Sequence, residues 1–323
     1  MAVQKIEITS RTILTTLLYL LGFWFLYQIR GIIITLFISF ILMTAVGPLV
    51  RGAAKVKIPP MVVFLLLFLA VVGIFTTLVV SLVPAIVTET AGLVQNLPKF
   101  LDSLSARWSI VVSPTMFSTQ FGDIPSNLLK IAAGTFGNLV TVFAVFFMTY
   151  YLYIERANLP HFLRLFLGTG DGGRRIESIV ADIEKRVGGW VRGELLLMTI
   201  IGVMSFIGLT LLGIPYTLPL ALLAGLMEAV PNIGPVISAI PAILMGLTVS
   251  PLTGLGALAM SILIQQTENN FVVPKVMQTA AGIRPIVTIV VLLIGYTLGG
   301  VMGAVLAIPL YLAIETVYKA LQT

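Results

Sequence analysis

The sequence predicts an all-α polytopic membrane protein with about six transmembrane helices and two re-entrant hairpins that are broken by glycine and proline. Three observations predict this fold class. First, 58% of the residues are hydrophobic and only 10% are charged, whereas about 25% of the residues of a soluble domain are charged. Second, apolar runs of about 20 residues recur along the chain, and that length crosses the hydrocarbon core of a bilayer. Third, two late apolar runs carry proline and glycine near their centres, where a straight helix is interrupted.

Composition also excludes several classes of site. The chain has no cysteine, which excludes disulfides, thiolate chemistry and Cys-ligated metal sites. Its one histidine, His161, leaves little for an imidazole cluster. The net charge of +6 comes from basic residues that lie between apolar runs, so it indicates membrane topology and not nucleic-acid binding. We therefore expect no cofactor, no dedicated metal site and no nucleic-acid partner.

The N-terminal region, residues 1–87, is expected to contain three spans. The first two, residues 12–29 and 31–50, are separated only by Arg30, which predicts a tight outer turn at Arg30 and Gly31. The remainder of the region forms the third span. Basic residues follow the second span directly and mark the cytoplasmic side of the membrane: Arg51, Lys55 and Lys57.

The middle of the chain alternates between the two membrane surfaces. Residues 88–130 are expected to form an extracytoplasmic amphipathic segment, and residues 131–154 the fourth span. Residues 155–194 are expected to form a cytoplasmic amphipathic linker, because they hold seven Lys or Arg whereas the outer segment holds three. Within this linker a helix is expected to end at Gly188 and Gly189. This orientation predicts that both termini are cytoplasmic.

Residues 195–318 are expected to form a C-terminal transport region. After a fifth span, the stretch from Glu228 to Pro235 interrupts an apolar run and leaves two arms of about 20 Å each, shorter than the roughly 30 Å hydrocarbon core. The arms could form one broken crossing helix or a re-entrant hairpin. Lys275 and Arg284 favour the hairpin, because that topology places both charges on the cytoplasmic side.

The C-terminal region also contains an internal similarity. Residues 238–244 (SAIPAIL) resemble residues 306–312 (LAIPLYL), and each follows a glycine-interrupted apolar arm. Since the first unit starts inside and the second outside, the pattern predicts an inverted repeat, a feature of secondary transporters. The alternative is a chance match between short apolar segments.

Glu228 and Asn232 are the first candidate binding residues. An ionised acid is costly to bury in an apolar arm, so Glu228 must be protonated, paired with a cation or open to a water-filled path. A proton-exchanging carboxyl or a Na⁺ ligand would meet this requirement. The structural alternative is a carboxyl that caps a free backbone N–H beside Pro231.

Gln265, Glu268 and Asn269 form the second candidate group. Spacings of three and four residues place their side chains on one face of a helix, where they could bind Na⁺ or a hydroxylated solute. The structural alternative is an interfacial helix end. Glu194 and Glu315 lie at expected span boundaries and are expected to be solvated. The residues expected to break the helices and act as hinges are Pro231, Gly234, Pro235, Gly299 and Gly300.

These motifs resemble those of the AI-2E family of bacterial transporters, also called PerM-like and named for autoinducer-2 exporters. The similarity covers nearly the whole chain. It rests on the following segments: 189–194 (GWVRGE), 231–235 (PNIGP) with Pro241, 265–270 (QQTENN) with Pro274, then Pro285, Gly295, Gly299, Gly300, Gly303, and 307–310 (AIPL). The chain has Glu194 where the family often has Gln, and Gln278 where it often has Gly.

The resemblance implies a polytopic, homo-oligomeric carrier of the bacterial cytoplasmic (inner) membrane. Members of the family are associated with export of autoinducer-2, and some with exchange of sodium or lithium for protons. We therefore expect a secondary transporter that exports a small polar, autoinducer-2-like solute by using an ion gradient. The alternatives are a Na⁺(Li⁺)/H⁺ antiporter and a passive pore or structural oligomer. The expected partners are membrane lipids and a small polar solute, or a monovalent cation and a proton.

An enzymatic function is not expected. The sequence contains no HExxH zinc motif, no GxSxG serine motif and no pair of aspartates within the membrane.

Overall fold

The computed structural model describes residues 10–85, 88, 139–156, 158, 171–231, 233–277 and 283–322. These described residues form helices and connecting turns and contain no strand. Four of the helical stretches are long and apolar enough to cross a membrane, at residues 30–55, 60–85, 175–211 and 286–322, and shorter apolar helices accompany them. The prediction of an all-α polytopic membrane protein is confirmed.

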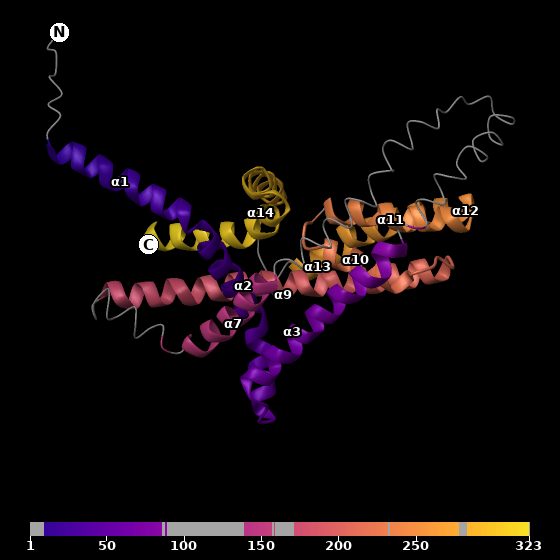
Figure 1. Ribbon diagram of the computed structural model, residues 1–323, viewed down its shortest axis with the longest axis horizontal. Helices are drawn as coiled ribbons and strands as arrows, with labels where there is room; N and C mark the ends of the chain where they lie inside the picture. Colours follow the sequence, from indigo (N-terminus) through magenta and orange to yellow (C-terminus); the bar gives the residue numbers. More distant parts are fainter. Residues whose placement is uncertain are drawn as a thin grey trace, which may run out of the picture.

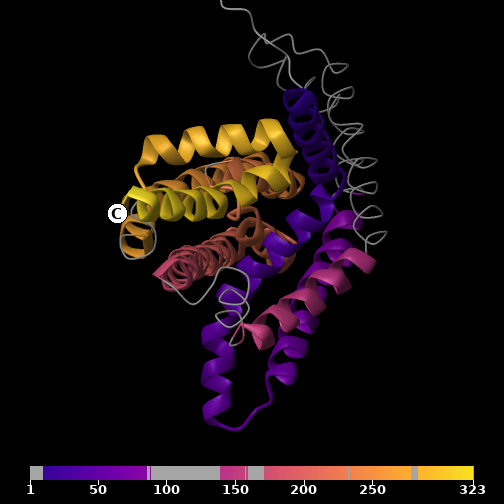
Figure 2. The same ribbon diagram turned by 90° about the vertical axis from the view of Figure 1, so that its left-hand side faces the viewer.

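The N-terminal helices differ from the expected arrangement. α1 (Ser10–Gln28) continues into α2 (Arg30–Lys55) without reversing direction (Figures 1 and 2). The Ile29 N–H donates to Phe25 O at 3.0 Å, and the Ile29 carbonyl accepts from Ile33 N at 3.1 Å. The tight outer turn expected at Arg30 and Gly31 is therefore wrong, because helical hydrogen bonding passes through the site.

The chain reverses at the basic end of α2. Lys57 adopts a left-handed conformation, with φ of 61°, and Pro59 and Pro60 then start α3 (Pro60–Thr77). Proline suits this position because the first helical N–H groups have no intrahelical partner. The π-helical segment η1 (Leu78–Leu82) extends α3.

α7 (Leu139–Glu155) packs beside α2 and α3 (Figure 2). Aromatic rings join α3 to α7: the Phe64 ring lies 5.6 Å from that of Tyr150 in an edge-on geometry, and Phe68 lies 4.7 Å from Phe146. The expected extracytoplasmic amphipathic segment, apart from Thr88, lies outside the described residues.

A single long helix forms the centre of the molecule. α9 (Asp171–Leu211) has 41 residues and runs along the long axis of the view in Figure 1. The expected break at Gly188 and Gly189 is wrong. Gly188 instead permits a close approach to α2, because a Cβ there would lie 3.1 Å from the Cβ of Thr44.

Helices α10 to α13 lie along the C-terminal half of α9. α10 (Thr217–Met227) and α11 (Ile233–Val249) pack against each other across the interruption at Pro231, as the predicted hairpin requires. α12 (Pro251–Thr267) begins at an N-cap where Ser250 accepts a hydrogen bond from Thr253 N. The following segments are η2 (Glu268–Val272), which is π-helical, and α13 (Val273–Met277).

α14 (Pro285–Gln322) contains the second predicted interruption. Gly299 and Gly300 are non-helical, and Gly300 has φ of 61°, a conformation that favours glycine. The two arms turn back against each other at Gly295 and Gly303, where a Cβ on Gly295 would lie 2.5 Å from Gly303 O (Figure 2). The first arm is about 20 Å long, which is too short to cross the bilayer alone.

Two hydrophobic cores share α9. The first joins α2, the N-terminal half of α9 and α14 around Val187, Trp190 and Leu312. The second joins η1, the C-terminal end of α9 and helices α10 to α12 around Leu209 and Met245. The stretch of α9 between these cores carries Glu194.

Candidate functional site

Three buried glutamates from separate elements meet beside the middle of α9. Glu194 lies on α9, Glu228 follows α10, and Glu268 begins η2. Their exposed fractions are 4%, 1% and 2%. The three side chains are close enough for mutual electrostatic interaction. We refer to them as the carboxyl cluster.

The helix interruption fixes the position of Glu228. A Cβ on Gly234 would overlap the carbonyl of Met227 and lie 3.2 Å from Glu228 N, so only glycine allows the start of α11 to lie on this peptide. The Gly234 N–H donates to Val230 O at 2.9 Å, which closes the turn. The predicted break therefore places a carboxyl at the junction of two short helices.

Glu268 is positioned by the change from α12 to η2. Gln265 Nε2 donates to Glu268 Oε2 at 3.1 Å. The carboxyl of Glu228 lies close to that of Glu268. Asn269 lies on the exposed side of the segment and outside this group. The spacing that predicts one shared face brings Gln265 and Glu268 together, whereas Asn269, the residue after Glu268, is exposed.

The closeness of Glu228 and Glu268 has a chemical consequence. An ionised carboxylate has only acceptor atoms, so two carboxyl groups can hydrogen-bond each other only where one of them carries a proton. No described Lys or Arg forms an ion pair with either group. Since two ionised carboxylates would repel each other here, the pair is suited to hold a proton in place of a salt bridge.

Three oxygens of the carboxyl cluster are buried without a hydrogen-bond partner among the described residues: Glu194 Oε1, Glu194 Oε2 and Glu228 Oε2. Native proteins pair nearly all buried polar atoms, because an unpaired one costs roughly 1–3 kcal/mol. Such a concentration of unpaired acceptors is expected where a proton, water or cation binds. Within the described residues, no three acidic or imidazole groups are arranged as a complete metal site.

A small cavity adjoins the carboxyl cluster. It has a volume of about 40 Å³, and its polar lining consists of Ser205, Ser238, Ser261 and Gln265. Because Gln265 also donates to Glu268, it connects the cavity to the cluster. A water molecule needs at least about 10–15 Å³ of such space, so this serine cavity accommodates a few water molecules or one small ion.

The serine hydroxyls keep acceptor capacity toward this cavity. Ser238 donates to Pro235 O at 3.1 Å and Ser261 donates to Ala257 O at 2.9 Å, so the lone pairs of both hydroxyl oxygens remain available. Ser205, on α9, also lines this cavity.

Glycines on α9 and α10 bring the cluster together. A Cβ on Gly225 would lie 2.6 Å from Met198 O and 3.3 Å from the Cα of Gly202. The two helix backbones therefore touch one turn before Glu228, and this contact sets the approach of Glu228 to Glu194.

The sequence-based candidates are distributed unevenly in the structure. Glu228, Gln265 and Glu268 lie together, whereas Asn232 lies outside the described residues. Gly299 and Gly300 form the break in α14, away from these side chains.

The expectation that Glu194 is solvated is wrong. Its side chain falls on the helical stripe of buried residues formed by Val187, Val191, Leu197 and Ile201. If the helix is continued past Gly188 and Gly189, this helical spacing identifies Glu194 as buried from the sequence.

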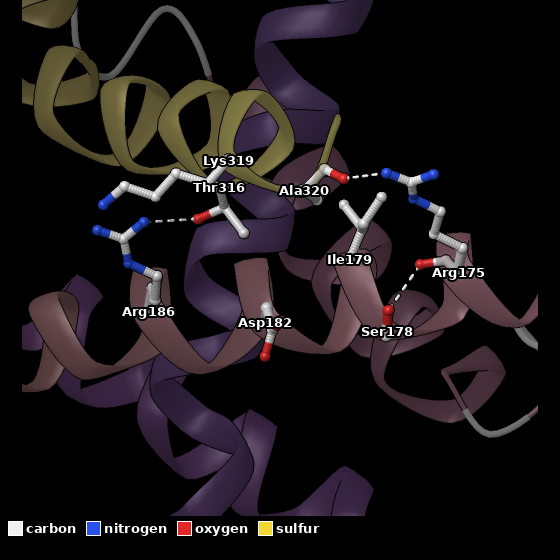
Figure 3. Close-up of a pocket in the computed structure, with 8 residues that line it drawn as sticks. All are labelled: Arg175, Ser178, Ile179, Asp182, Arg186, Thr316, Lys319 and Ala320. Atoms are coloured by element: carbon white, nitrogen blue, oxygen red, sulfur yellow. Dashed lines mark hydrogen bonds between the residues drawn. The ribbon is translucent and has the colours of Figure 1, made fainter. Parts of the chain in front are cut away.

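A second group of charges lies in a groove of about 600 Å³ between α9 and α14 (Figure 3). Arg186 contacts Glu315 Oε2 at 2.5 Å and donates to Thr316 Oγ1 at 3.0 Å, and Lys319 contacts Glu315 Oε1 at 2.7 Å. Arg175 donates to the carbonyl of Ala320 (Figure 3). We call Arg186, Glu315, Thr316 and Lys319 the ionic joint.

Comparison with known proteins identifies the family. The sequence model of the AI-2E family transporters matches residues 13–323. The chain belongs to the AI-2E transporter family. Its broken helices and buried carboxyl cluster are thus features of an AI-2E protein, and a general role in membrane transport follows.

Relatives of this AI-2E protein are named for transport. YueF, a candidate transport protein of Bacillus subtilis strain 168, is 26% identical over 317 residues, covering 91% of this chain and 85% of YueF. YrrI of the same organism is 24% identical over 294 residues, covering 86% and 82% of the two chains. A protein of Halobacillus andaensis named sodium-lithium/proton antiporter is 27% identical over 231 residues, covering 70% of this chain and 64% of its own.

Proposed function

We propose that this AI-2E protein is a proton-coupled secondary transporter in which Glu228 and Glu268 carry the proton. The observation that supports this most strongly is the burial of two neighbouring carboxyl groups, Glu228 and Glu268, that no described Lys or Arg pairs with. Ionisable side chains in membrane segments are costly, and they mark proton or ion pathways. The position of Glu228 at a helix interruption agrees with this role, since secondary transporters build ion sites from broken helices.

The proposed cargo is a monovalent cation that is exchanged for the proton. The serine cavity is small, which favours a dehydrated Na⁺ or Li⁺ over an organic solute. Loss of the shared proton leaves a negative charge that the cation neutralises, and return of the proton releases the cation. The antiporter name of the Halobacillus andaensis relative supports the same choice.

Export of a small polar, autoinducer-2-like solute is the second candidate. One observation favours it: amide side chains stand exposed beside Glu268, where Asn270 Nδ2 donates to Gln266 Oε1 at 3.3 Å. Such amides bind hydroxylated solutes through hydrogen bonds. In this case the proton on the Glu228–Glu268 pair would drive export of the solute.

The proposed location is the bacterial cytoplasmic membrane, with the protein acting as a homo-oligomer. The C-terminus is proposed to be cytoplasmic because Lys319 on the last helix lies in the basic groove with Arg186. A cytoplasmic N-terminus stays a prediction, since residues 1–9 lie outside the described ranges.

Proton movement in proteoliposomes tests the proposal. A pH-sensitive dye would be followed after addition of sodium, lithium or potassium salts to the wild type, Glu228→Gln and Glu268→Gln. Glutamine has nearly the same shape as glutamate and can form hydrogen bonds, but it has no carboxyl proton to release. Each variant should therefore abolish cation-dependent proton movement. Asp182→Asn, which removes an exposed acid from α9, should leave it unchanged.

Retention of proton movement in both Glu variants would exclude the carboxyl pair as the proton carrier. A wild type that moves no protons with any cation, but exports a solute when a pH gradient is applied, would support the second candidate. Ion conductance that does not saturate with solute would instead indicate a passive pore.

A further inference from the structure

A separate basic pocket lies where the ends of α2 and α7 meet α9. Its volume is about 240 Å³. This pocket lies between α9 and the ends of α2 and α7, whereas the ionic joint lies between α9 and α14. Its charged and polar lining residues are Thr44, Arg51, Arg156, Glu184, Lys185 and Arg192.

The positive charge of this pocket is only partly neutralised. Arg156 Nε contacts Glu184 Oε1 at 2.6 Å, so this acid is already paired. Arg51, Lys185 and Arg192 have no carboxylate partner among the described residues. The pocket therefore holds three cations whose charge an anion could balance.

Glycines leave room for two of the guanidinium groups. A Cβ on Gly47 would lie 3.3 Å from Arg51 Nη1, and a Cβ on Gly188 would lie 3.1 Å from Arg192 Nη1. Arg192 Nη1 also donates to Thr44 O at 3.5 Å. The missing side chains let both arginines lie along their helices, where they remain exposed and accessible to a ligand.

The surroundings of the pocket indicate a lipid. Arg51 follows the apolar part of α2, and Arg156 directly follows α7, so the pocket lies at the boundary between apolar helix surface and the polar side. Large apolar side chains stand exposed next to it: Leu49, Tyr151 and Ile154. A ligand that combines a phosphate with acyl chains would contact both the cations and this apolar surface.

We propose that the basic pocket binds a phosphate-bearing anion, supplied by the headgroup of an anionic phospholipid of the cytoplasmic leaflet. The phosphate contacts Arg51, Lys185 and Arg192, while the acyl chains lie over the exposed apolar side chains of α2 and α7. Basic pockets between helices on the cytoplasmic side are a known means of binding anionic headgroups. Such a lipid would join three helices, one of which carries Glu194 on its next turns.

Thermal stability of the purified full chain in detergent tests this proposal. Phosphatidylglycerol, phosphatidylcholine and inorganic phosphate would be titrated separately into the wild type, Arg51→Gln/Arg192→Gln and the matched control Lys275→Gln, which removes an exposed charge from α13. Phosphatidylglycerol should raise the melting temperature of the wild type and of the control. The double variant should need at least about tenfold more of this lipid for the same shift, a change of about 1.4 kcal/mol.

The following results would overturn the proposal or its lipid assignment. Equal stabilisation of all three proteins by phosphatidylglycerol, or equal stabilisation of the wild type by phosphatidylcholine, would overturn the proposal. If inorganic phosphate stabilises the wild type and displaces the lipid at similar concentrations, the pocket is a free-anion site and the lipid assignment is wrong. If the double variant does not fold, Lys185→Gln is tested in its place, because it alters only one exposed side chain. The proposal then requires that Lys185→Gln weaken phosphatidylglycerol binding about threefold or more.

Discussion

Glutamates occupy two contrasting environments in this AI-2E protein. In the ionic joint, Glu315 accepts from Arg186 and Lys319, so its negative charge is balanced by two cations. In the carboxyl cluster, Glu228 and Glu268 are buried close together, and no described Lys or Arg pairs with either. The same residue type thus joins two helices through ion pairs at one site and lies without a paired cation at the other, where we propose that it carries a proton.

Substitutions in the carboxyl cluster and in the ionic joint should differ most in their effect on the transport rate. Glu228→Gln should lower cation-dependent proton exchange by at least about 100-fold, the scale on which loss of a proton-transferring group acts. Glu315→Gln should keep exchange within about threefold of the wild type, because its charge serves a structural contact. Initial rates in proteoliposomes at matched protein density measure both. A large loss in Glu315→Gln would remove the distinction between the two environments.

A second prediction concerns the turn that positions Glu228. Gly234→Ala introduces a Cβ that overlaps Met227 O, so the start of α11 must move. We expect a loss of about 1–3 kcal/mol in stability, the usual cost of overpacking, together with reduced exchange. The matched control is Gly22→Ala, where nothing lies within 4 Å of the added Cβ. Thermal unfolding and transport would be measured on both variants, and equal behaviour of the two would contradict the role given to Gly234.

A third prediction separates cation binding from proton transfer. Ser205→Ala and Ser238→Ala should each raise the half-saturating Li⁺ or Na⁺ concentration up to about tenfold, equivalent to about 1.4 kcal/mol, while the maximal rate is kept. Ser178→Ala, near the N-terminal end of α9, should change neither quantity. Unchanged cation affinity in both cavity variants would mean that the cation binds elsewhere, even if the carboxyl pair still carries the proton.

The smallest effect is expected at the ionic joint. Glu315→Gln removes two partly exposed ion pairs, so stability should fall by about 0.5–1 kcal/mol at low salt. The difference from the wild type should shrink in 1 M salt, because the Debye length there is about 3 Å. Melting temperatures at the two salt concentrations test this, and a difference that does not depend on salt would show that the contact is not electrostatic.

Sequence reasoning located the helix interruptions well, because their cause is local. Pro231 lacks a backbone N–H, and Gly300 adopts a positive φ that favours glycine, so both positions are suited to a helix interruption. Glu228 was found for a similar reason, since an acid within an apolar arm requires an explanation wherever the arm lies. The domain boundaries and the inverted repeat stay predictions.

The features that sequence reasoning missed depend on tertiary contacts. Gly188 looked like a helix end, but its lack of a side chain serves the approach of Thr44 from a distant helix. With a helix end at Gly188, Glu194 would lie at a span boundary, whereas its side chain is buried in the structure. The spacing from Gln265 groups Asn269 with Glu268, but which of these two consecutive residues is buried depends on the helices packed against them. The continuation of α1 into α2 was missed because one arginine between two apolar runs resembles a turn.

The length of α9 has a mechanical consequence. With 41 residues, it is about 60 Å long, and it approaches α2 closely at Gly188, between the ionic joint and Glu194. Intrahelical hydrogen bonds resist bending, so a helix of this length moves largely as one rigid body. A tilt of α9 that opens the groove at the ionic joint would therefore also displace Glu194 relative to Glu228 and Glu268.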